Sequence, residues 1–397
     1  MPKEPRETSV GQRQTYAHQG SRKRLETLLK WVGAVTAVVS LILGLYQVTQ
    51  LVSDIRERKR HIAELHGVGK QQQGAGDFPS AWASFEQALK NADEGGQIAK
   101  LTGRLDPERR QLREAQEDLA MAWLENIRVA EGQKFSDIVD KLVPVLDRGI
   151  GGANGIRKSD LLAHVGWAYF LKTREGPRNV NPEKYYRQAS EIDPANPYAH
   201  AYWGHWILWN SGNLEDALKH FSAAVASGRE VPHVRTIQLS ALRIARSERT
   251  DGEFLRVVND MRKNNEQIDA STRSDVYSIY YFALSAGEDF QRLTAAVPAS
   301  EQIAVIRALY YGADFDPSKI PTREACLAIL QEAAGLPNEA LRTWLAIRSN
   351  LSANIYGTLV ARADAAIKRL SQHAQKTPAK GTAVDLASPS MTKQPTH

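Results

Sequence analysis

Two histidines and a single cysteine are the side chains with the most obvious chemical potential in this sequence. His200 and His205 lie five positions apart in YAHAYWGHWILWN, and Cys326 is the only cysteine. Zinc ligands on one helix lie three or four positions apart, on a shared face. A spacing of five turns the two imidazoles away from each other, so we expect surface or packing roles for both. Cys326 lies between apolar neighbours, which favours packing over a nucleophilic role.

A glycine-rich run, GIGGANGIRKS, covers residues 149–159. A phosphate-binding loop needs Gly-Lys-Ser/Thr between a strand and a helix, whereas Gly155 is followed here by Ile156 and the preceding pattern is helical. The run is therefore predicted to be a loop between helices. No Ser-centred elbow is present either, so we expect no enzyme, no cofactor and no metal site. An enzyme built from dispersed side chains stays open as an alternative.

The charge and composition of the chain limit the kinds of partner that it is expected to bind. The formal net charge is +6, and residues 1–30 hold seven Lys/Arg against three acidic residues, whereas the remainder holds 44 against 42. The basic character therefore belongs to the N-terminal tail, while a nucleic-acid surface needs clustered Lys/Arg on a folded face. No nucleic-acid partner is expected. One cysteine also excludes an intramolecular disulfide.

An uncharged stretch near the N-terminus predicts a membrane anchor. Residues 31–52, WVGAVTAVVSLILGLYQVTQLV, carry no charge. As a helix they would reach about 33 Å, enough for a hydrocarbon core of about 30 Å. A cleaved signal peptide would be shorter and end in small residues, and an interfacial helix would show a charged face. A single transmembrane helix over 31–52 is the favoured interpretation.

The charges on the two sides of the predicted anchor give nearly equal support to its two possible orientations. Four Lys/Arg precede the span closely and four follow it. The short basic N-terminal tail slightly favours a cytoplasmic N-terminus, which would place the soluble part outside the cytoplasm. The equal number of Lys/Arg on the two sides of the span does not itself decide the orientation. The Ala-, Arg- and Gly-rich composition points to a bacterial inner membrane.

Three stretches of the remaining sequence repeat one spacing. Glycine is followed five residues later by a small residue, four later by an aromatic residue and three later by another small or apolar residue. The sets are Gly76, Ala81, Phe85, Ala88; Gly212, Ala217, Phe221, Ala224; and Gly335, Ala340, Trp344, Ile347. Spacings of four and three place the last three residues of each set on one helical face. The glycine is expected to end one helix, and Asp77 or Asn213 to cap the next.

The partner helix of each unit is visible as well. Tyr186 and Ala189 precede Phe221 and Ala224 by 35 residues, and Gly166 and Gly204 lie in the preceding helices. Small residues in both helices let the backbones approach, and the aromatic side chain fills the space beside that contact. This pattern, closest in QASEIDPANPYAHAYWG, resembles the tetratricopeptide repeat (TPR), a helix–turn–helix unit of about 34 residues.

The resemblance implies an all-α chain in which helix pairs stack into an α-solenoid. The clearest repeats are residues 62–95, 160–196, 197–230 and 322–350, within a repeat region over 60–375. The last helix is expected over 352–373, with an inner face formed by Val360, Ala361, Ala365, Ile367 and Leu370. Residues 1–21 and 376–397 carry little apolar content and are predicted to be disordered tails.

In the register of that family, the first helix of each repeat lines a concave groove, and the resemblance implies which side chains would face a protein or peptide partner. They are His66, Lys70, Gln73, Asp160, Trp167, Phe170, Tyr198, His205 and Trp209. Large aromatic residues often contribute most to partner binding, because they bury a large surface area and have few rotatable bonds. Tyr169 and Trp203 are expected in the core instead. The Lys/Arg/Asn pattern that some members use to hold chaperone tails is absent.

The function that follows is a single-pass, membrane-anchored adaptor or scaffold, with the bilayer contacted through residues 31–52. A structural, self-assembling subunit is the second alternative. Gly33, Ala37, Ser40 and Gly44 share one face of the span, and such a stripe of small residues can let two spans pack closely.

Overall fold

The computed structural model describes residues 12–94, 103–127, 134–176, 180–245, 247–310, 321–351 and 353–376. Within these ranges the chain forms 16 α-helices and no strand, which confirms the all-α class. The helices are α1 (Gln12–Gly74), α2 (Phe78–Asp93), α4 (Asp106–Glu125), α5 (Ser136–Gly152), α6 (Gly155–Thr173), α7 (Glu183–Ile192), α8 (Pro197–Ser211), α9 (Leu214–Ala226), α10 (Val231–Ala245), α11 (Glu248–Lys263), α12 (Ala270–Ser285), α13 (Gln291–Ala296), α14 (Ala299–Tyr310), α15 (Pro321–Ala333), α16 (Pro337–Asn350) and α17 (Ala353–Lys376).

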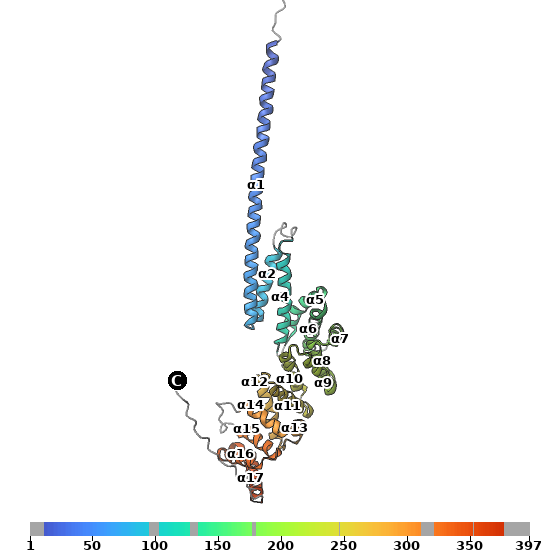
Figure 1. Cartoon of the computed structure of the whole chain (residues 1–397), viewed down its shortest axis with the longest axis vertical. Helices are drawn as coiled ribbons and strands as arrows, with labels where there is room; N and C mark the ends of the chain where they lie inside the picture. The colour runs from blue at the N-terminus through green and yellow to red at the C-terminus, as the bar shows by residue number, and fades with distance from the viewer. Residues whose placement is uncertain are drawn as a thin grey trace, which may run out of the picture. The chain divides into compact units, whose positions relative to one another are not determined.

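The chain divides into two compact units. The first comprises residues 1–127 together with 144–149, and the second comprises 128–143 and 150–397. In the first unit, α2 and α4 lie beside the C-terminal part of α1, while its N-terminal part stands clear of them (Figure 1). The apolar stretch is uncovered by any described residue: Val38, Leu41 and Ile42 are each more than half exposed. This long apolar helix could span a membrane by its length and composition.

The ends of the chain differ partly from the sequence expectation. Because α1 begins at Gln12, the second half of the predicted disordered tail 1–21 is helical. Residues 1–11 and the predicted tail beyond Lys376 lie outside the described part of the chain.

The C-terminal part of α1 continues without a break from the apolar stretch into a packed interface. Ile55 and Ile62 are buried, on the same face as Gly69. A Cβ at Gly69 would lie 2.5 Å from Phe85 Cε1 of α2. Only glycine therefore lets the Phe85 ring lie directly on the backbone of α1.

Gly69→Ala and Gly67→Ala are expected to change the stability of this interface in opposite directions. The first forces the Phe85 ring to move, which costs about 1–3 kcal/mol of unfolding free energy. The second adds a Cβ into open space and removes a flexible residue from a helix, a gain of about 0.5–1 kcal/mol. Hydrogen–deuterium exchange of the α2 amides measures both. Equal effects of the two substitutions would contradict the close packing.

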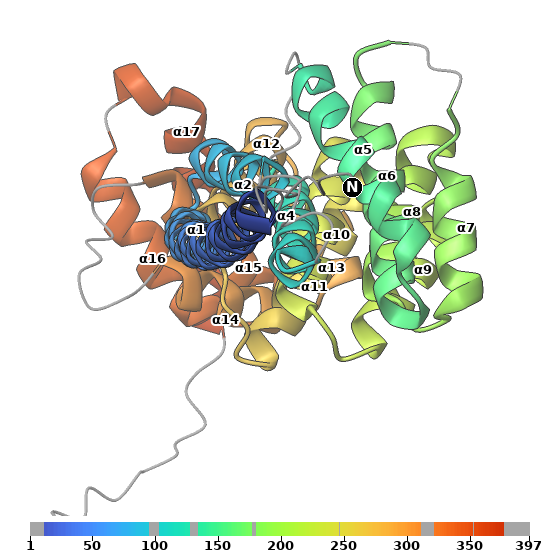
Figure 2. The same ribbon diagram turned by 90° about the horizontal axis from the view of Figure 1, so that it is seen from above.

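In the second unit, helices pack mainly on neighbours one or two positions along the chain. α6 contacts α7 and α8, α8 contacts α9 and α10, and α10 contacts α11. Figure 2 shows α6 to α9 lying side by side. Each of the four clearest predicted repeats coincides with two helices that pack on each other: the end of α1 with α2, α6 with α7, α8 with α9, and α15 with α16.

The repeated residues occupy equivalent places in three of these pairs. Gly76, Gly212 and Gly335 have φ values of +78°, +67° and +74°, the left-handed conformation that ends a helix and favours glycine. Ala81, Phe85, Ala88, Ala217, Phe221, Ala224, Ala340, Trp344 and Ile347 are all buried. The side chains of Asp77 and Asn213 accept hydrogen bonds from the first turns of α2 and α9, as predicted.

The small residues of the first helices also behave as predicted. A Cβ at Gly166 would lie 2.5 Å from Tyr186 Cε1, and a Cβ at Gly204 would lie 3.0 Å from the Ala217 carbonyl oxygen and from Phe221 Cε1. Each glycine thus receives an aromatic ring from the second helix of its own pair. This contact fixes the spacing of α6 to α7 and of α8 to α9.

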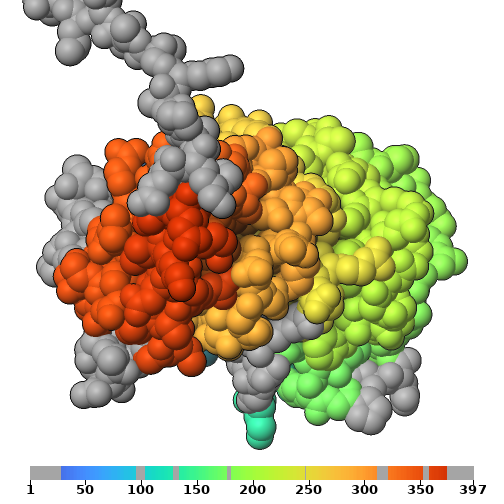
Figure 3. Space-filling model, turned by 90° about the horizontal axis from the view of Figure 1, so that it is seen from below, coloured from blue at the N-terminus to red at the C-terminus, as the bar shows by residue number. Residues whose placement is uncertain are grey.

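The C-terminal part of the second unit follows the chain in order, and the yellow, orange and red segments adjoin one another in Figure 3. α17 packs on α16. Its buried face is Leu359, Ala363, Ala366 and Leu370, whereas Ala361 and Ala365 are exposed. The predicted inner face was therefore right for Leu370 and wrong for Ala361 and Ala365, while Val360 and Ile367 are half-buried at its edge, because alanine and valine on either side of the buried stripe obscure its boundary.

Candidate functional site

The end of α8 and the helices around it hold most of the residues predicted to face a partner. Asn196 caps α8 by accepting a hydrogen bond from Ala199 N at 2.8 Å, and Pro197 occupies the first turn. Gly212 ends the helix with its N–H donating to the Leu208 carbonyl oxygen. α8 lies between α6 and α10, so its aromatic residues meet side chains from both neighbours.

An aromatic stack joins α6 to α8. The Trp167 ring lies parallel to Tyr202 at 4.6 Å and to Phe170 at 4.9 Å between ring centroids. The His205 ring meets Trp167 and Phe170 edge-on, at 5.2 Å and 4.9 Å. Offset and edge-to-face arrangements of this kind stabilise packed cores beyond the area they bury. The stack is a structural feature of the α6–α8 contact.

Three of the predicted groove residues therefore lie in the core. Trp167 and Phe170 have no exposed surface, and His205 is 1% exposed. Conversely, Tyr169 and Trp203, expected in the core, are half-buried and pair with Tyr185 and His220. The expectation was wrong for these side chains because α6 is covered by α7 and α8 on different faces, and α8 is itself covered by α6, α9 and α10.

Trp209 is the exposed aromatic residue of the predicted set. Its side chain is 44% exposed, and the Arg174 guanidinium lies 4.6 Å above its ring. Such a cation–π contact holds the indole in a fixed orientation at the surface. Tyr198, also in the set, is half-buried beside His164, with 4.5 Å between ring centroids.

Asp160 takes part in an ion-pair network rather than lining an open surface. Asn196 Nδ2 donates to Asp160 Oδ1 at 2.6 Å, and Arg229 reaches Asp160 at 3.3 Å and Asp193 at 3.2 Å. Burial raises the pKa of the Asp160 carboxyl, while Asn196 and Arg229 favour its charged form. The network ties α6 to the turns that precede α8 and α10.

The remaining three predicted residues, His66, Lys70 and Gln73, belong to the first unit. His66 is half-buried against the Phe85 ring at 5.7 Å, and burial followed by the charge of Lys70 lowers its pKa. Lys70 is exposed and Gln73 half-buried. All three residues belong to α1, the first helix of the α1–α2 pair.

A histidine pair was not foreseen from the sequence. His200 Nε2 lies 2.9 Å from the Pro194 carbonyl oxygen, and its Nδ1 lies 3.0 Å from His220 Nδ1 of α9. In its neutral form His200 donates from Nε2 to this carbonyl, so that its Nδ1 accepts and His220 Nδ1 donates. Burial and the neighbouring His200 lower the pKa of His220 to about 4. The predicted spacing argument holds: His200 and His205 point to different neighbours.

A cavity of about 430 Å³ opens beside His205. Its walls are about as polar as apolar. Their apolar side chains come from α8, the N-terminal end of α9 and the C-terminal end of α10, including Leu208, Leu214, Ala241 and Ile244. The start of α11 closes one side with Ser247, Arg249 and Thr250. Cavities of this size are typical of sites for small ligands or single side chains.

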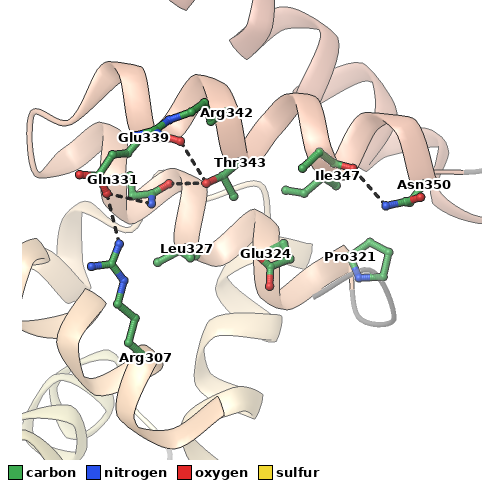
Figure 4. Close-up of a pocket in the computed structure, with 11 residues that line it drawn as sticks. Arg307, Pro321, Glu324, Leu327, Gln331, Glu339, Arg342, Thr343, Ile347 and Asn350 are labelled. Carbon is green, nitrogen blue, oxygen red and sulfur yellow. Dashed lines mark hydrogen bonds and ion pairs between the residues drawn. The ribbon is translucent and has the colours of Figure 1, made fainter. Parts of the chain in front are cut away.

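A second hollow, of about 550 Å³, lies among α14, α15 and α16. Figure 4 shows Arg307 reaching from α14 toward Glu339 and Gln331. Arg307 and Gln331 both contact Glu339 Oε2, at 3.2 Å and 3.4 Å, and Thr343 donates to Gln331 Oε1 at 2.8 Å. Arg307, Gln331, Glu339 and Thr343 therefore satisfy one another across this hollow.

The described residues contain no group of three or more His, Cys, Asp or Glu placed to hold a metal ion. Cys326 is buried, and burial raises the pKa of its thiol to about 12, so it remains protonated at neutral pH. The prediction of a loop over the glycine-rich run 149–159 was wrong for most of its length: residues 149–152 end α5, residues 155–159 begin α6, and only residues 153 and 154 connect the two helices.

Comparison with protein-family models gives no match. The sequence also matches no curated protein.

Proposed function

We propose that the chain is a single-pass membrane protein whose TPR-like helix pairs form an α-solenoid that binds a protein or peptide partner near the bilayer. The observation that carries the proposal is the continuity of α1, which runs unbroken from the uncharged stretch 31–52 into its packing against α2. Ile55, three residues beyond the apolar stretch, is already buried. The anchor and the first helix pair are thus one rod, which confines the repeats to the membrane surface and raises their effective concentration toward membrane partners.

The repeated close-packed helix pairs support the solenoid part of this proposal. In each of three pairs, a left-handed glycine and a buried small–aromatic–small face recur at the same spacing. A solenoid is formed when each such pair buries its hydrophobic faces against the next. Trp209 and Phe282, which are 44% and 68% exposed, are apolar surfaces available to a partner.

The anchor is tested by charge substitution. Ile42 lies at the centre of the stretch 31–52 and Trp31 at its end. Ile42→Arg places a cation at mid-bilayer, at about 2.5–3.5 kcal/mol on insertion scales, and is expected to shift the chain from the alkaline-resistant membrane fraction to the soluble fraction. Trp31→Arg is the matched control and is expected to leave membrane retention unchanged.

Two further measurements complete the test. The intact mass of the purified chain separates an anchor, which retains residues 31–52, from a cleaved signal sequence, which does not. Photo-cross-linking from position 209, compared with the exposed position 345 on α16, is expected to capture a membrane or membrane-adjacent protein preferentially at 209. Cross-links only to a second copy of the chain would favour the self-assembling subunit instead.

A further inference from the structure

One end of the first unit lies beside the apolar stretch of α1. α2 turns back along α1 after Gly76 and packs on it. α4 runs antiparallel to α2, because Arg109 near its start donates to the Ala92 carbonyl oxygen near the end of α2. Trp123, near the end of α4, lies in turn beside Phe78 at the start of α2, with 6.2 Å between ring centroids. The start of α4 and the end of α2 therefore point toward the apolar stretch, and Figure 1 shows both beside the middle of α1.

Distances along the helices place this end at the level of the lipid headgroups. Lys59 Nζ lies 2.7 Å from Glu108 Oε1, so α1 and α4 are at similar levels there. Lys59 is seven residues beyond Val52, the end of the apolar stretch, or about 10 Å along the helix. Arg104 comes four residues before Glu108 and so lies nearer the stretch, while Arg56 is about 6 Å beyond Val52. Headgroups extend about 5–7 Å beyond each side of the hydrocarbon core, so both arginines lie within their reach.

Three exposed arginines at this end have no ion-pair or hydrogen-bond partner among the described residues. They are Arg56 and Arg58 of α1 and Arg104, in the turn before α4. A guanidinium group presents a planar set of N–H donors that can hold two oxygens of one phosphate at once. The three side chains are therefore available to the phosphate groups of the bilayer.

Most acidic groups at this end are already paired with other basic side chains. The ion pairs are Lys59–Glu108, Arg60–Glu57, Lys90–Glu94, and Arg109 with both Asp93 and Asp106. Asp54 is the exception, because it is exposed and has no ion-pair partner in the part of the chain that the structure describes. Three unpaired arginines thus stand against one unpaired carboxylate, and the excess of positive charge favours anionic over uncharged lipid.

We infer that this end of the first unit lies on the headgroup layer and binds anionic phospholipids, with Arg56, Arg58 and Arg104 pairing with the lipid phosphates. The inference rests on the proposed membrane anchor and adds a second contact with the bilayer, outside the spanning stretch. Because Arg104 belongs to a different part of the chain from the anchor helix, its contact holds the α2–α4 pair at the membrane surface.

Fluorescence quenching tests the position of this end. The full chain is placed in nanodiscs of phosphatidylcholine and phosphatidylglycerol, in which some lipids carry a nitroxide on the headgroup. Pro107→Cys or Glu114→Cys supplies the thiol for a fluorophore, and the native Cys326 is buried and stays unlabelled. Pro107 and Glu114 are exposed on α4, seven residues apart and hence on one face. Because about 10 Å separates their levels, the label at 107 is expected to be quenched at least about twofold more strongly than the label at 114.

Lipid titration tests the role of the charge. With the label at position 107 and the full chain in uncharged maltoside micelles, short-chain phosphatidylglycerol is expected to change the fluorescence saturably. Phosphatidylcholine of the same chain length is expected to bind at least about tenfold more weakly. Arg104→Ala is expected to weaken the affinity for phosphatidylglycerol about fivefold, the effect of one cation near an anionic surface. Arg113→Ala is the matched control, because Arg113 is also exposed on α4 but lies nine residues farther from the bilayer, and it is expected to leave the affinity unchanged.

Each measurement has an outcome that overturns the inference. Equal quenching of the labels at 107 and 114 means that the start of α4 does not lie at the headgroups. Equal affinity for the two lipids, or equal affinity of Arg104→Ala and Arg113→Ala for phosphatidylglycerol, means that the arginines do not select anionic lipid. Circular dichroism verifies that the variants retain the fold. Either failure leaves membrane retention and its loss in Ile42→Arg untouched, so it is distinguishable from failure of the proposed function.

Discussion

Lowering the pH from 7 to 5 is expected to destabilise the second unit by about 2–3 kcal/mol, through two histidines that fold in their neutral form. The pKa of His205 is lowered to about 3 and that of His220 to about 4, from an ordinary value of 6.5. Between pH 7 and pH 5, the two histidines therefore become protonated in the unfolded chain but stay neutral in the folded chain. The two histidines make their full contribution to the free energy of unfolding above pH 6.5. This contribution is lost as the pH falls toward their pKa values in the folded chain.

The size of the effect follows from the same linkage. At pH 5, a histidine that stays neutral in the folded chain costs about 2 kcal/mol of unfolding free energy. His205 is fully buried and is expected to contribute that amount, while the half-buried His220 contributes less because solvent screens its charge. Asp160 and Asp251, whose pKa values are raised by burial, oppose the trend as their carboxyls protonate at lower pH.

Urea unfolding of the full chain at pH 7 and pH 5 measures the loss, and His205→Leu isolates its main source. The leucine removes an unpartnered polar group, so the variant is expected to be about 1–2 kcal/mol more stable at pH 7 and less sensitive to acid. His61→Leu, at an exposed position of α1, is the control and is expected to retain the full pH dependence. An unchanged pH dependence in His205→Leu would contradict the neutral, buried imidazole.

Trp167→Ala and Trp209→Ala are expected to separate a core residue from a surface residue within one aromatic cluster. Trp167 is fully buried between Tyr202 and Phe170, so its removal leaves a cavity and costs about 3–5 kcal/mol of unfolding free energy. Trp209 is 44% exposed, and its removal is expected to cost less than about 1 kcal/mol.

Chemical denaturation followed by circular dichroism compares the two variants without depending on tryptophan fluorescence. Cross-linking or binding should respond in the reverse order, because Trp209 is presented to solvent and Trp167 is not. Similar losses of stability in both variants would mean that the α6–α8 stack does not form the core of this region.

The sequence determined the helix pairs and their internal packing. The glycine that ends a helix, the cap that follows and the small–aromatic–small face are local features, separated by one or two turns of the same chain. Phe85, Phe221 and Trp344 are buried where the spacing placed them. Because a helix repeats every 3.6 residues, the buried face of a two-helix unit can be predicted from the spacing of its small and aromatic residues alone. The uncharged stretch that gives α1 its exposed apolar surface is equally local.

The tertiary structure decided which aromatic residues are covered and which groups meet across pairs. Trp167 and Phe170 are buried, while Tyr169 of the same helix is half-buried, because α6 contacts α7 and α8 on different faces. That choice depends on the rotation of one helix pair against the next, which residues many positions apart determine together. The cavity beside His205 depends on it too, since α8, α10 and α11 must all be placed before the space between them exists.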